Sequence, residues 1–234
     1  MNYVILNGVK STTIKGLLIQ SLPPISKPLM RTSVEEIDGR DGDIVTKLGY
    51  SAYNKQMSIG LFGDYNVDEV IQFFDSQGTV TFSNEPDKFY NYQIIQQIDF
   101  ARLIRFKTAI VTFHVQPFKY SAVDDAFTFS NDDESDSFTI FNRGNIVSRP
   151  TFTIYGSGTI NLSINGTELF TINLGDAGFI TLDGAQMNAY QGDILMNRYV
   201  VGDYNNLRFN IGTNTVSWTG TVSQIKVENY ARWI

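Results

Sequence analysis

The chain has 234 residues, carries 18 basic and 24 acidic side chains, and contains one histidine and no cysteine. These counts exclude a disulfide framework, a cysteine nucleophile and any metal site that needs cysteines or two histidines. With 42% hydrophobic and only 18% charged residues, the composition indicates a globular protein rich in β-structure or in subunit contacts.

The first half opens with an apolar strand predicted at residues 3–6, which ends at the turn signal Asn7-Gly8. Further along, Pro23, Pro24 and Pro28 lie close together. Prolines fix an extended backbone and remove hydrogen-bond donors. We therefore expect this segment to be an arm or a sheet edge instead of a central strand.

One helix is predicted in this half, after the capping residue Asn66. Glu69 stands three residues later, as in a capping box, and Gly78 is expected to end the helix. Four apolar residues are predicted to share its buried face: Val67, Val70, Ile71 and Phe74. Strands are predicted at residues 79–82 and 110–115, so the first half is expected to be a small α+β domain.

The charge imbalance of the chain lies in residues 121–136. Residues 1–120 carry 12 basic and 12 acidic side chains, and residues 137–234 carry six of each. The run between them has six carboxylates and no basic partner: Asp124, Asp125, Asp132, Asp133, Glu134 and Asp136. Such a run repels itself and stays solvated, which favours an exposed connector at residues 121–137.

A calcium loop is the alternative for the acidic run, because Asp132, Glu134 and Asp136 alternate. An EF-hand loop needs a glycine at its sixth position and a glutamate at its twelfth. Ser137 and Arg143 stand at those positions, so the connector is the favoured interpretation.

Residues 138–234 are predicted to form an antiparallel β-sandwich. Alternating segments and turn signals recur there, and no proline follows Pro150. The clearest signal is Asn165-Gly166, which separates two alternating segments as a two-residue hairpin turn does. No helix is predicted in this half. The chain is therefore expected to be mainly β, with a domain over residues 1–120 and a sandwich over residues 138–234.

Few residues indicate catalysis. His114 lies in an alternating strand, where a histidine is usually a partly buried strand residue. No GxSxG motif or Walker loop accompanies it, and Asn161 replaces the third glycine of a dinucleotide fingerprint that begins at Gly156. Glycoside hydrolysis by a pair of carboxylates is not excluded by the sequence, but no particular pair stands out. We expect no catalytic, cofactor-binding or metal-binding residues.

Basic residues cluster only at Arg102, Arg105 and Lys107. Binding to phosphates requires several clustered cations, so specific nucleic-acid binding is not expected. Aromatic residues reach 13% of the chain. Most aromatic residues are expected in the core. For residues 89–92 and 229–233, a place in the core and a place in a subunit interface are equally expected.

The order of the motifs resembles the distal tail protein (Dit) family of siphophages, which have long, non-contractile tails. The resemblance spans nearly the whole chain. It rests on the strand that ends at Asn7-Gly8, on Arg31, on Gly39-Arg-Asp-Gly42, on residues 111–120 and on residues 142–156.

The resemblance implies a structural protein without enzymatic activity, located at the virion tail tip after folding and assembly in the bacterial host cytoplasm. In that family the first domain forms a hexameric ring, often through an arm or belt laid on the neighbouring subunit. The second domain is a galectin-like β-sandwich. The implied partners are five further copies of the chain, the tail tube protein and the tail-associated or tail-tip protein, with receptor-binding proteins as further candidates. No cofactor, membrane or specific nucleic acid is implied.

We expect residues 20–45 to supply much of the contact between subunits, because stiffening by proline lowers the entropic cost of docking. The candidate contact residues are Pro23, Pro24, Pro28, Arg31, Arg40 and Asp41. For the three charged residues, an ion pair inside their own turn is the alternative.

The alternative function is a carbohydrate-binding accessory module that recognises the host cell wall, favoured by the sandwich and the aromatic content. A fold does not carry a function by itself. Galectins bind galactosides through a histidine, among other residues, and residues 138–234 contain no histidine. A galectin-type sugar site is therefore not expected.

Overall fold

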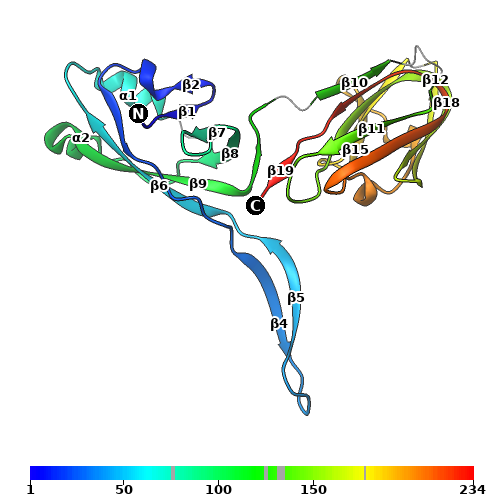
Figure 1. Cartoon of the computed structure of the whole chain (residues 1–234), viewed down its shortest axis with the longest axis horizontal. Coiled ribbons are helices and arrows are strands. Elements are labelled where there is room, and N and C mark those ends of the chain that lie inside the picture. Colours follow the sequence, from blue (N-terminus) through cyan, green and yellow to red (C-terminus); the bar gives the residue numbers. More distant parts are fainter. Residues whose placement is uncertain (75–76, 124–125, 131–134, 177) are drawn as a thin grey trace. The chain divides into compact units, whose positions relative to one another are not determined.

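A computed structural model describes residues 1–74, 77–123, 126–130, 135–176 and 178–234 (Figure 1). The chain forms two compact units, Met1–Val123 with Ile234 and Asp124–Trp233. Each unit has its own cluster of buried hydrophobic side chains. The division falls inside the segment expected to be the connector.

Antiparallel strands dominate the first unit, in the order β2-β1-β7-β8-β9-β6-β3. The strands are β1 (Val4–Leu6), β2 (Val9–Lys10), β3 (Leu17–Ser21), β6 (Tyr53–Leu61), β7 (Gln77–Phe82), β8 (Lys88–Gln93) and β9 (Thr108–Ser121), with a 3-10 turn η1 (Ser11–Thr13). Leu6 pairs with Val9 across Asn7-Gly8, which confirms the predicted turn.

Helix α1 (Val67–Phe73) begins as predicted, because the Asn66 side chain accepts a hydrogen bond from the backbone N–H of Asp68 at 3.0 Å. Val70 and Phe74 are buried, but Ile71 is 43% exposed. Its predicted place on the buried face is therefore wrong.

Gly78 does not end α1, because it lies within β7. It has φ +143°, and a Cβ there would lie 1.8 Å from Oδ1 of Asn7. The same Asn7 oxygen accepts from the backbone N–H of Thr79 at 2.8 Å. Gly78 thus permits a close approach between two segments that lie far apart in the sequence.

A second helix, α2 (Phe100–Phe106), was not predicted. The Asp99 side chain caps it by accepting from the backbone N–H of Arg102 at 2.8 Å. Lys107 ends the helix in the left-handed conformation with φ 57°. Leu103 is its only buried residue, so the sequence lacks the apolar periodicity by which an amphipathic helix is recognised.

Residues 30–50 form a projecting hairpin of two strands, β4 (Met30–Glu36) and β5 (Asp43–Tyr50), in a sheet of their own. The predicted turn at residues 38–42 connects them. Figure 1 shows this hairpin leaving the rest of the first unit beyond the ends of β3 and β6. We refer to residues 30–50 as the hairpin arm.

Phe113 lies at the centre of the first unit's core and is fully buried. Its ring packs edge-on against Phe82 and Tyr92, with centroids 5.6 and 5.2 Å away. Removing a buried phenylalanine typically costs about 3–5 kcal/mol. We expect Phe113→Ala to destabilise the first unit by that amount.

Trp218 is buried in the core of the second unit. In a Trp233→Phe background Trp218 is the one tryptophan left, so fluorescence reports the second unit alone. Urea unfolding of Phe113→Ala should show an earlier transition by circular dichroism and an unchanged transition by fluorescence. An equal shift in both signals would contradict independent cores.

The second unit is a β-sandwich whose two longest strands, β12 (Thr151–Ile164) and β18 (Gly212–Glu228), run through both layers. One layer has the order β10-β18-β12-β14-β15-β16; in the other, β11 pairs with β18, and β13 pairs with β12 and β17. The remaining strands of the sandwich are β10 (Ala126–Ser130), β11 (Ser137–Asn142), β13 (Thr167–Gly175), β14 (Phe179–Asp183), β15 (Asn188–Gln191), β16 (Ile194–Leu195) and β17 (Val200–Gly202), with 3-10 turns η2 (Asn197–Tyr199) and η3 (Tyr204–Asn206). The terminal strand β19 (Arg232–Trp233) does not belong to the sandwich sheet.

The pairing of β12 with β18 changes register between Ser157 and Asn161. At this point the two backbones come very close, since a Cβ on Gly220 would lie 2.2 Å from the carbonyl oxygen of Thr159. Strands that bend in this way pass from one layer of a sandwich to the other.

Asn165-Gly166 forms the predicted hairpin turn, and Ile164 pairs with Thr167 across it. Residues 126–130, expected in the connector, instead form β10 and pair with β18. Ala126–Ser130 forms a strand because aromatic residues alternate along it. The Phe129 ring packs against the buried rings of Phe138 and Trp218.

Candidate functional site

The hairpin arm and the segment that anchors it form the candidate site. Four carbonyl oxygens of residues 23–29 accept hydrogen bonds from the first unit. Their donors are Asn84 Nδ2 to Pro23 at 3.0 Å, Lys55 Nζ to Pro24 at 2.8 Å, Tyr53 Oη to Ser26 at 3.3 Å and the Ser51 backbone N–H to Leu29 at 2.9 Å. The root of the arm is therefore fixed to the sheet.

A buried ionic network supports this anchor. Lys119 Nζ lies 2.6 Å from Glu85 Oε1, and the two side chains are only 8% and 9% exposed. Tyr90 Oη donates to the other Glu85 oxygen at 2.7 Å. Lys55, itself buried, has its Nζ 5.0 Å from the centre of the Tyr90 ring.

Burial lowers the pKa of Lys55 to about 8, with the Glu85 carboxylate opposing this change and the nearby Lys119 adding to it. At pH 7 Lys55 is still mainly protonated and donates to the Pro24 carbonyl. Burial, together with the hydrogen bond to Glu85, raises the pKa of Tyr90, so this phenol stays protonated and remains a donor.

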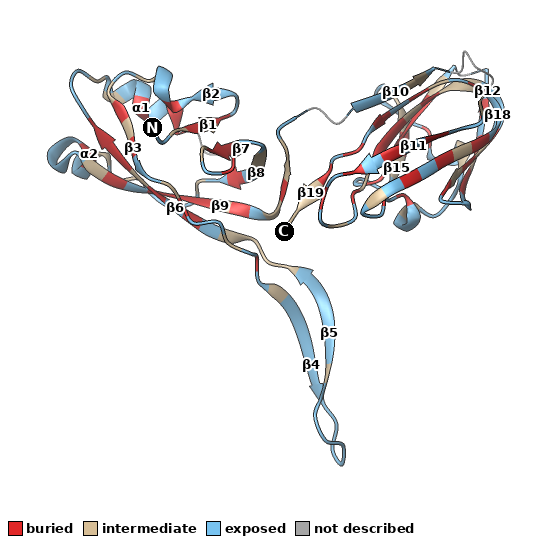
Figure 2. Cartoon of the chain, in the orientation of Figure 1, coloured by how far each residue is buried: buried red, intermediate tan, exposed pale blue. Residues whose placement is uncertain are grey.

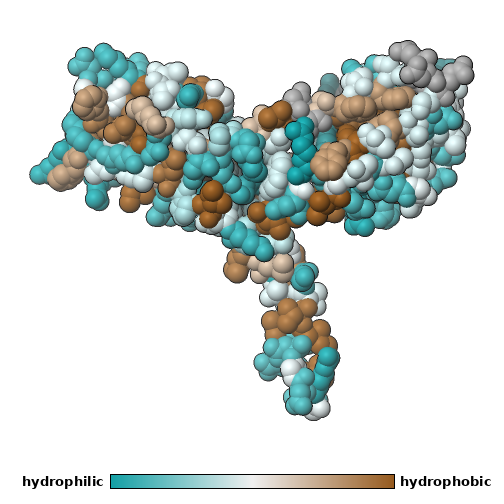
Figure 3. Space-filling model, viewed as in Figure 1, coloured by the Kyte–Doolittle hydropathy of each residue, from teal (hydrophilic) through white to brown (hydrophobic). Residues whose placement is uncertain are grey.

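The hairpin arm itself buries almost nothing (Figure 2). Val34 and Val45 pair directly across it and are 55% and 57% exposed, and Leu48 is 57% exposed. Brown apolar side chains stand out on the arm in Figure 3, with hydrophilic residues toward its tip. An isolated two-stranded hairpin is marginally stable in water, so this arm requires a surface to pack on.

Pro23 and Pro28 are buried in their own chain, while Pro24 is exposed. The prolines thus hold the root of the arm, and the projecting part, residues 30–50, overlaps only in part with residues 20–45, which are expected to supply contact between subunits. Residues 23–29 do not project because the first unit supplies hydrogen-bond donors for their carbonyl groups.

Arg31, Arg40 and Asp41 lie on the hairpin arm and are exposed. Ion pairs among the described residues include Lys15–Asp64, Lys88–Asp87 and Lys119–Glu85. None of them involves the arm, so the alternative of a pair inside the turn is absent from the described residues.

Sequence reasoning missed Lys55, Glu85 and Lys119. Glu85 and Lys119 lie 34 positions apart, and no local pattern links them. The only available signal is the presence of charged residues inside or beside alternating apolar segments, which a partly exposed strand shows equally well.

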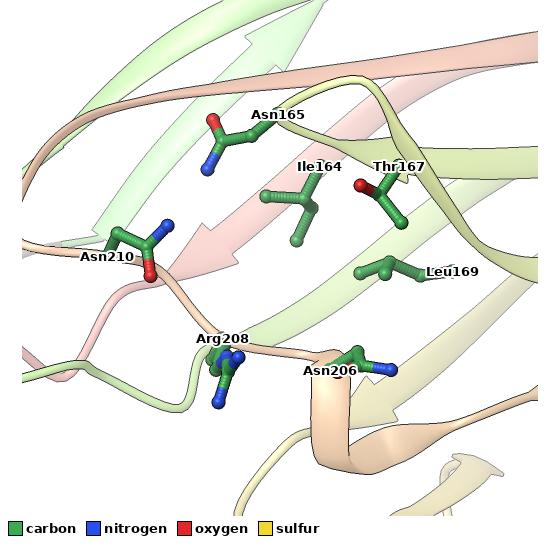
Figure 4. Close-up of a pocket in the computed structure, with 7 residues that line it drawn as sticks. All are labelled: Ile164, Asn165, Thr167, Leu169, Asn206, Arg208 and Asn210. Carbon is green, nitrogen blue, oxygen red and sulfur yellow. The ribbon is translucent and has the colours of Figure 1, made fainter.

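A pocket of about 200 Å³ lies beside the turn Asn165-Gly166 in the second unit (Figure 4). Its seven lining residues are Ile164, Asn165, Thr167, Leu169, Asn206, Arg208 and Asn210. None of these is aromatic, so the pocket lacks a ring on which a sugar could stack. Its volume is also below the roughly 300–1,000 Å³ of most small-molecule sites.

His114 is half-buried in β9, with Nδ1 2.9 Å from Oδ1 of Asn54, as expected for a strand residue. Within the described ranges, no three acidic or histidine side chains cluster closely enough to hold a metal ion. The proposed calcium ligands Asp132 and Glu134 lie outside those ranges. No helix that the structure describes is both long and apolar enough to cross a membrane.

No protein-family model and no curated protein matches the sequence. Among solved structures, the chain is similar to the Dit protein (gp 19.1) of phage SPP1, described as a paradigm of the hub adsorption apparatus in phages that infect Gram-positive bacteria. That similarity has a TM-score of 0.68 at 16% identity and covers 97% of this chain and 98% of the SPP1 protein.

Two further similar chains come from the baseplate of phage P2 in its activated conformation. The structure with Ca gives a TM-score of 0.49 and covers 97% of each chain, and the structure with Sr gives 0.44 and covers 96% of this chain and 97% of the other. Both are 9% identical to this chain. The SPP1 similarity extends over both units, and the chain therefore has a mainly β, Dit-like fold.

Proposed function

We propose that the chain is a structural subunit of a phage tail tip, in which six copies close into a ring that joins the tail tube to the tail-tip and receptor-binding apparatus. The observation that carries this proposal is the similarity to the SPP1 Dit protein over 97% of the chain. Its role is assembly and includes no catalysis.

The hairpin arm supports assembly as the physical task. The arm projects from the rest of the first unit and exposes apolar side chains. Within the described residues, none of its charged side chains forms an ion pair. A copy that covers this arm offers its own arm to the next copy. Such head-to-tail contacts close into a ring when the rotation between neighbours is suitable.

Permanent contacts of this kind commonly bury more than ~2,000 Å². The candidate contact residues of the arm are Arg31, Arg40 and Asp41, with Pro23, Pro24 and Pro28 holding its root. Fixing the arm before docking reduces the entropy lost on association, which gives the anchor of residues 23–29 a role in assembly.

The proposed partners besides further copies are the tail tube protein, a tail-associated or tail-tip protein and receptor-binding proteins. The ring would assemble in the host cytoplasm and stay at the tail tip of the virion. Residues 1–120 carry equal numbers of basic and acidic side chains, which suits a channel through which DNA passes without being retained.

The location is tested by immunogold electron microscopy of virions with antibodies raised against the full chain. We expect gold particles at the end of the tail that is distal to the capsid. Labelling of the capsid, or labelling along the whole tail tube, would contradict a tail-tip subunit.

The alternative role is binding of host cell-wall carbohydrate, for which the small pocket lined by Arg208 and Asn210 offers polar groups but no stacking ring. A pull-down with purified cell walls and the full chain distinguishes the two roles. An assembly subunit should stay in the supernatant. Retention that is lost in Arg208→Ala would favour the carbohydrate-binding role.

A further inference from the structure

We infer that the receptor for the hairpin arm is the surface around α2 of a second copy of this chain. This surface comprises Arg102, Ile104, Arg105 and Phe106 of α2. The inference rests on the proposed ring and adds the identity of the surface that the arm occupies.

The arm and α2 lie at opposite ends of the same strand pair. The arm joins β6 at Tyr53, which pairs with Val115 of β9, whereas α2 precedes Thr108 of β9, which pairs with Gly60. Seven residues of extended strand, about 24 Å at ~3.4 Å per residue, separate these ends.

The arm also points away from the sheet (Figure 1), so it does not contact α2 of its own chain. A second copy is required for the contact. Because the donor and the receptor are different surfaces at opposite ends of one unit, the resulting contact is heterologous, as a closed ring needs.

Charges on the arm are concentrated toward its tip. Residues 35–43 contain five carboxylates and one arginine. Glu36 and Asp43 pair directly across the strands, and like charges in that arrangement destabilise a hairpin. No lysine or arginine pairs with either of them in the described part of the chain, so a cation from another molecule would relieve the repulsion.

The surface around α2 has the opposite charge. The side chains of Arg102 and Arg105 are exposed, and neither pairs with a carboxylate among the described residues. Together with Asp99, Ala101 and Phe106 they line a hollow of about 520 Å³. Guanidinium groups bind carboxylates through paired hydrogen bonds.

Apolar side chains accompany the charges on both surfaces. Val34 and Val45 lie two positions from Glu36 and Asp43 and thus on the same face of the arm. On the receptor, Phe106 is 62% exposed and Ile104 42%. Each surface therefore offers an apolar patch beside its charged groups, and the two charges are complementary.

Charge reversal tests this pairing in the full chain, with the assembly state measured by light scattering and native mass spectrometry. We expect Arg102→Glu/Arg105→Glu to raise the apparent dissociation constant of the ring at least 100-fold, because close charge pairs contribute strongly to interfaces. Glu36→Arg/Asp43→Arg should have the same effect. Combining the four substitutions should restore assembly to within about tenfold of the unchanged chain.

The matched control is Arg198→Glu/Arg208→Glu, which reverses two exposed arginines of the second unit and should leave the ring intact. Circular dichroism verifies that each variant is folded. Should the double reversal on α2 unfold, Arg102→Gln/Arg105→Gln replaces it, with an expected weakening of at least tenfold.

A ring that persists after reversal of α2, or that the combined variant fails to restore, would overturn the assignment of the receptor. If α2 reversal has no effect while the arm variants disrupt the ring, the ring stands and its receptor lies elsewhere. If the unchanged chain forms no ring, the proposed function itself fails, so the two failures are distinguishable.

Discussion

A chain in which an Asn-Gly turn replaces residues 31–49 should be a folded monomer. Met30 and Tyr50 pair across the base of the arm, so a two-residue turn can join them. The removed residues are nearly all exposed and contribute nothing to the core of the first unit. The ring should be lost because its intersubunit contact is removed, while the melting temperature of the monomer stays close to its ordinary value.

Light scattering after size-exclusion chromatography measures this outcome directly. A smaller change, Val34→Thr/Val45→Thr, keeps the strands but removes apolar surface and should weaken the ring without abolishing folding. Val201→Thr is the matched control, since Val201 is 74% exposed and lies in the second unit. An arm-less chain that kept the mass of the unchanged assembly would contradict a role for the arm.

Deleting residues 22–30 is a less suitable test. That deletion removes the buried Pro23 and Pro28 as well as the carbonyl group that accepts from Lys55. We therefore expect this deletion to unfold the first unit, and a loss of assembly would then result from unfolding and not from the missing contact.

The second large effect is expected for Glu85→Ala. This change leaves Lys119 buried without its partner, and removing one member of a buried ion pair typically costs about 3–5 kcal/mol. The Tyr90 hydroxyl loses its acceptor at the same time. Urea unfolding followed by circular dichroism should show this loss in the transition of the first unit.

Asp64→Ala provides the control, because Asp64 pairs with Lys15 at 3.4 Å and their side chains are 90% and 70% exposed. Exposed pairs contribute about 1 kcal/mol or less. The combination of Glu85→Met, Lys119→Met and Tyr90→Phe should recover most of the stability, since an apolar replacement of a buried ionic group is often neutral. Equal effects of Glu85→Ala and Asp64→Ala would contradict a buried pair.

Local signals in the sequence predicted the elements that local interactions determine. The turns at Asn7-Gly8 and Asn165-Gly166 and the cap at Asn66 each depend on a few neighbouring residues. The mainly β composition of both units followed from alternation along the strands, for which short-range patterning suffices.

Elements that depend on distant partners escaped prediction. Gly78 resembles a helix stop, but its role is to admit the side chain of Asn7. Helix α2 buries only Leu103 and therefore shows no periodicity. The hydrogen-bond donors that hold residues 23–29 come from strands and turns up to 61 positions away. Proline content alone therefore could not show that these residues are anchored to the sheet while residues 30–50 project.

For the same reason, the sequence predicted the candidate site only in part. Arg31, Arg40 and Asp41 were predicted as candidate contact residues between subunits, and all three lie exposed on the arm. Glu36 and Asp43 were missed, because their significance arises from pairing across the hairpin. Arg102 and Arg105 were recognised as a basic cluster too small for nucleic-acid binding, and we infer that their acidic counterpart is the arm of a second copy.

Native mass spectrometry of the full chain, alone and mixed with the tail tube protein, tests the central proposal most directly. The proposal predicts a dominant species of six copies of the 26.3 kDa chain, seen as a six-fold annulus by electron microscopy. Single chains that stay dispersed in both samples would contradict it.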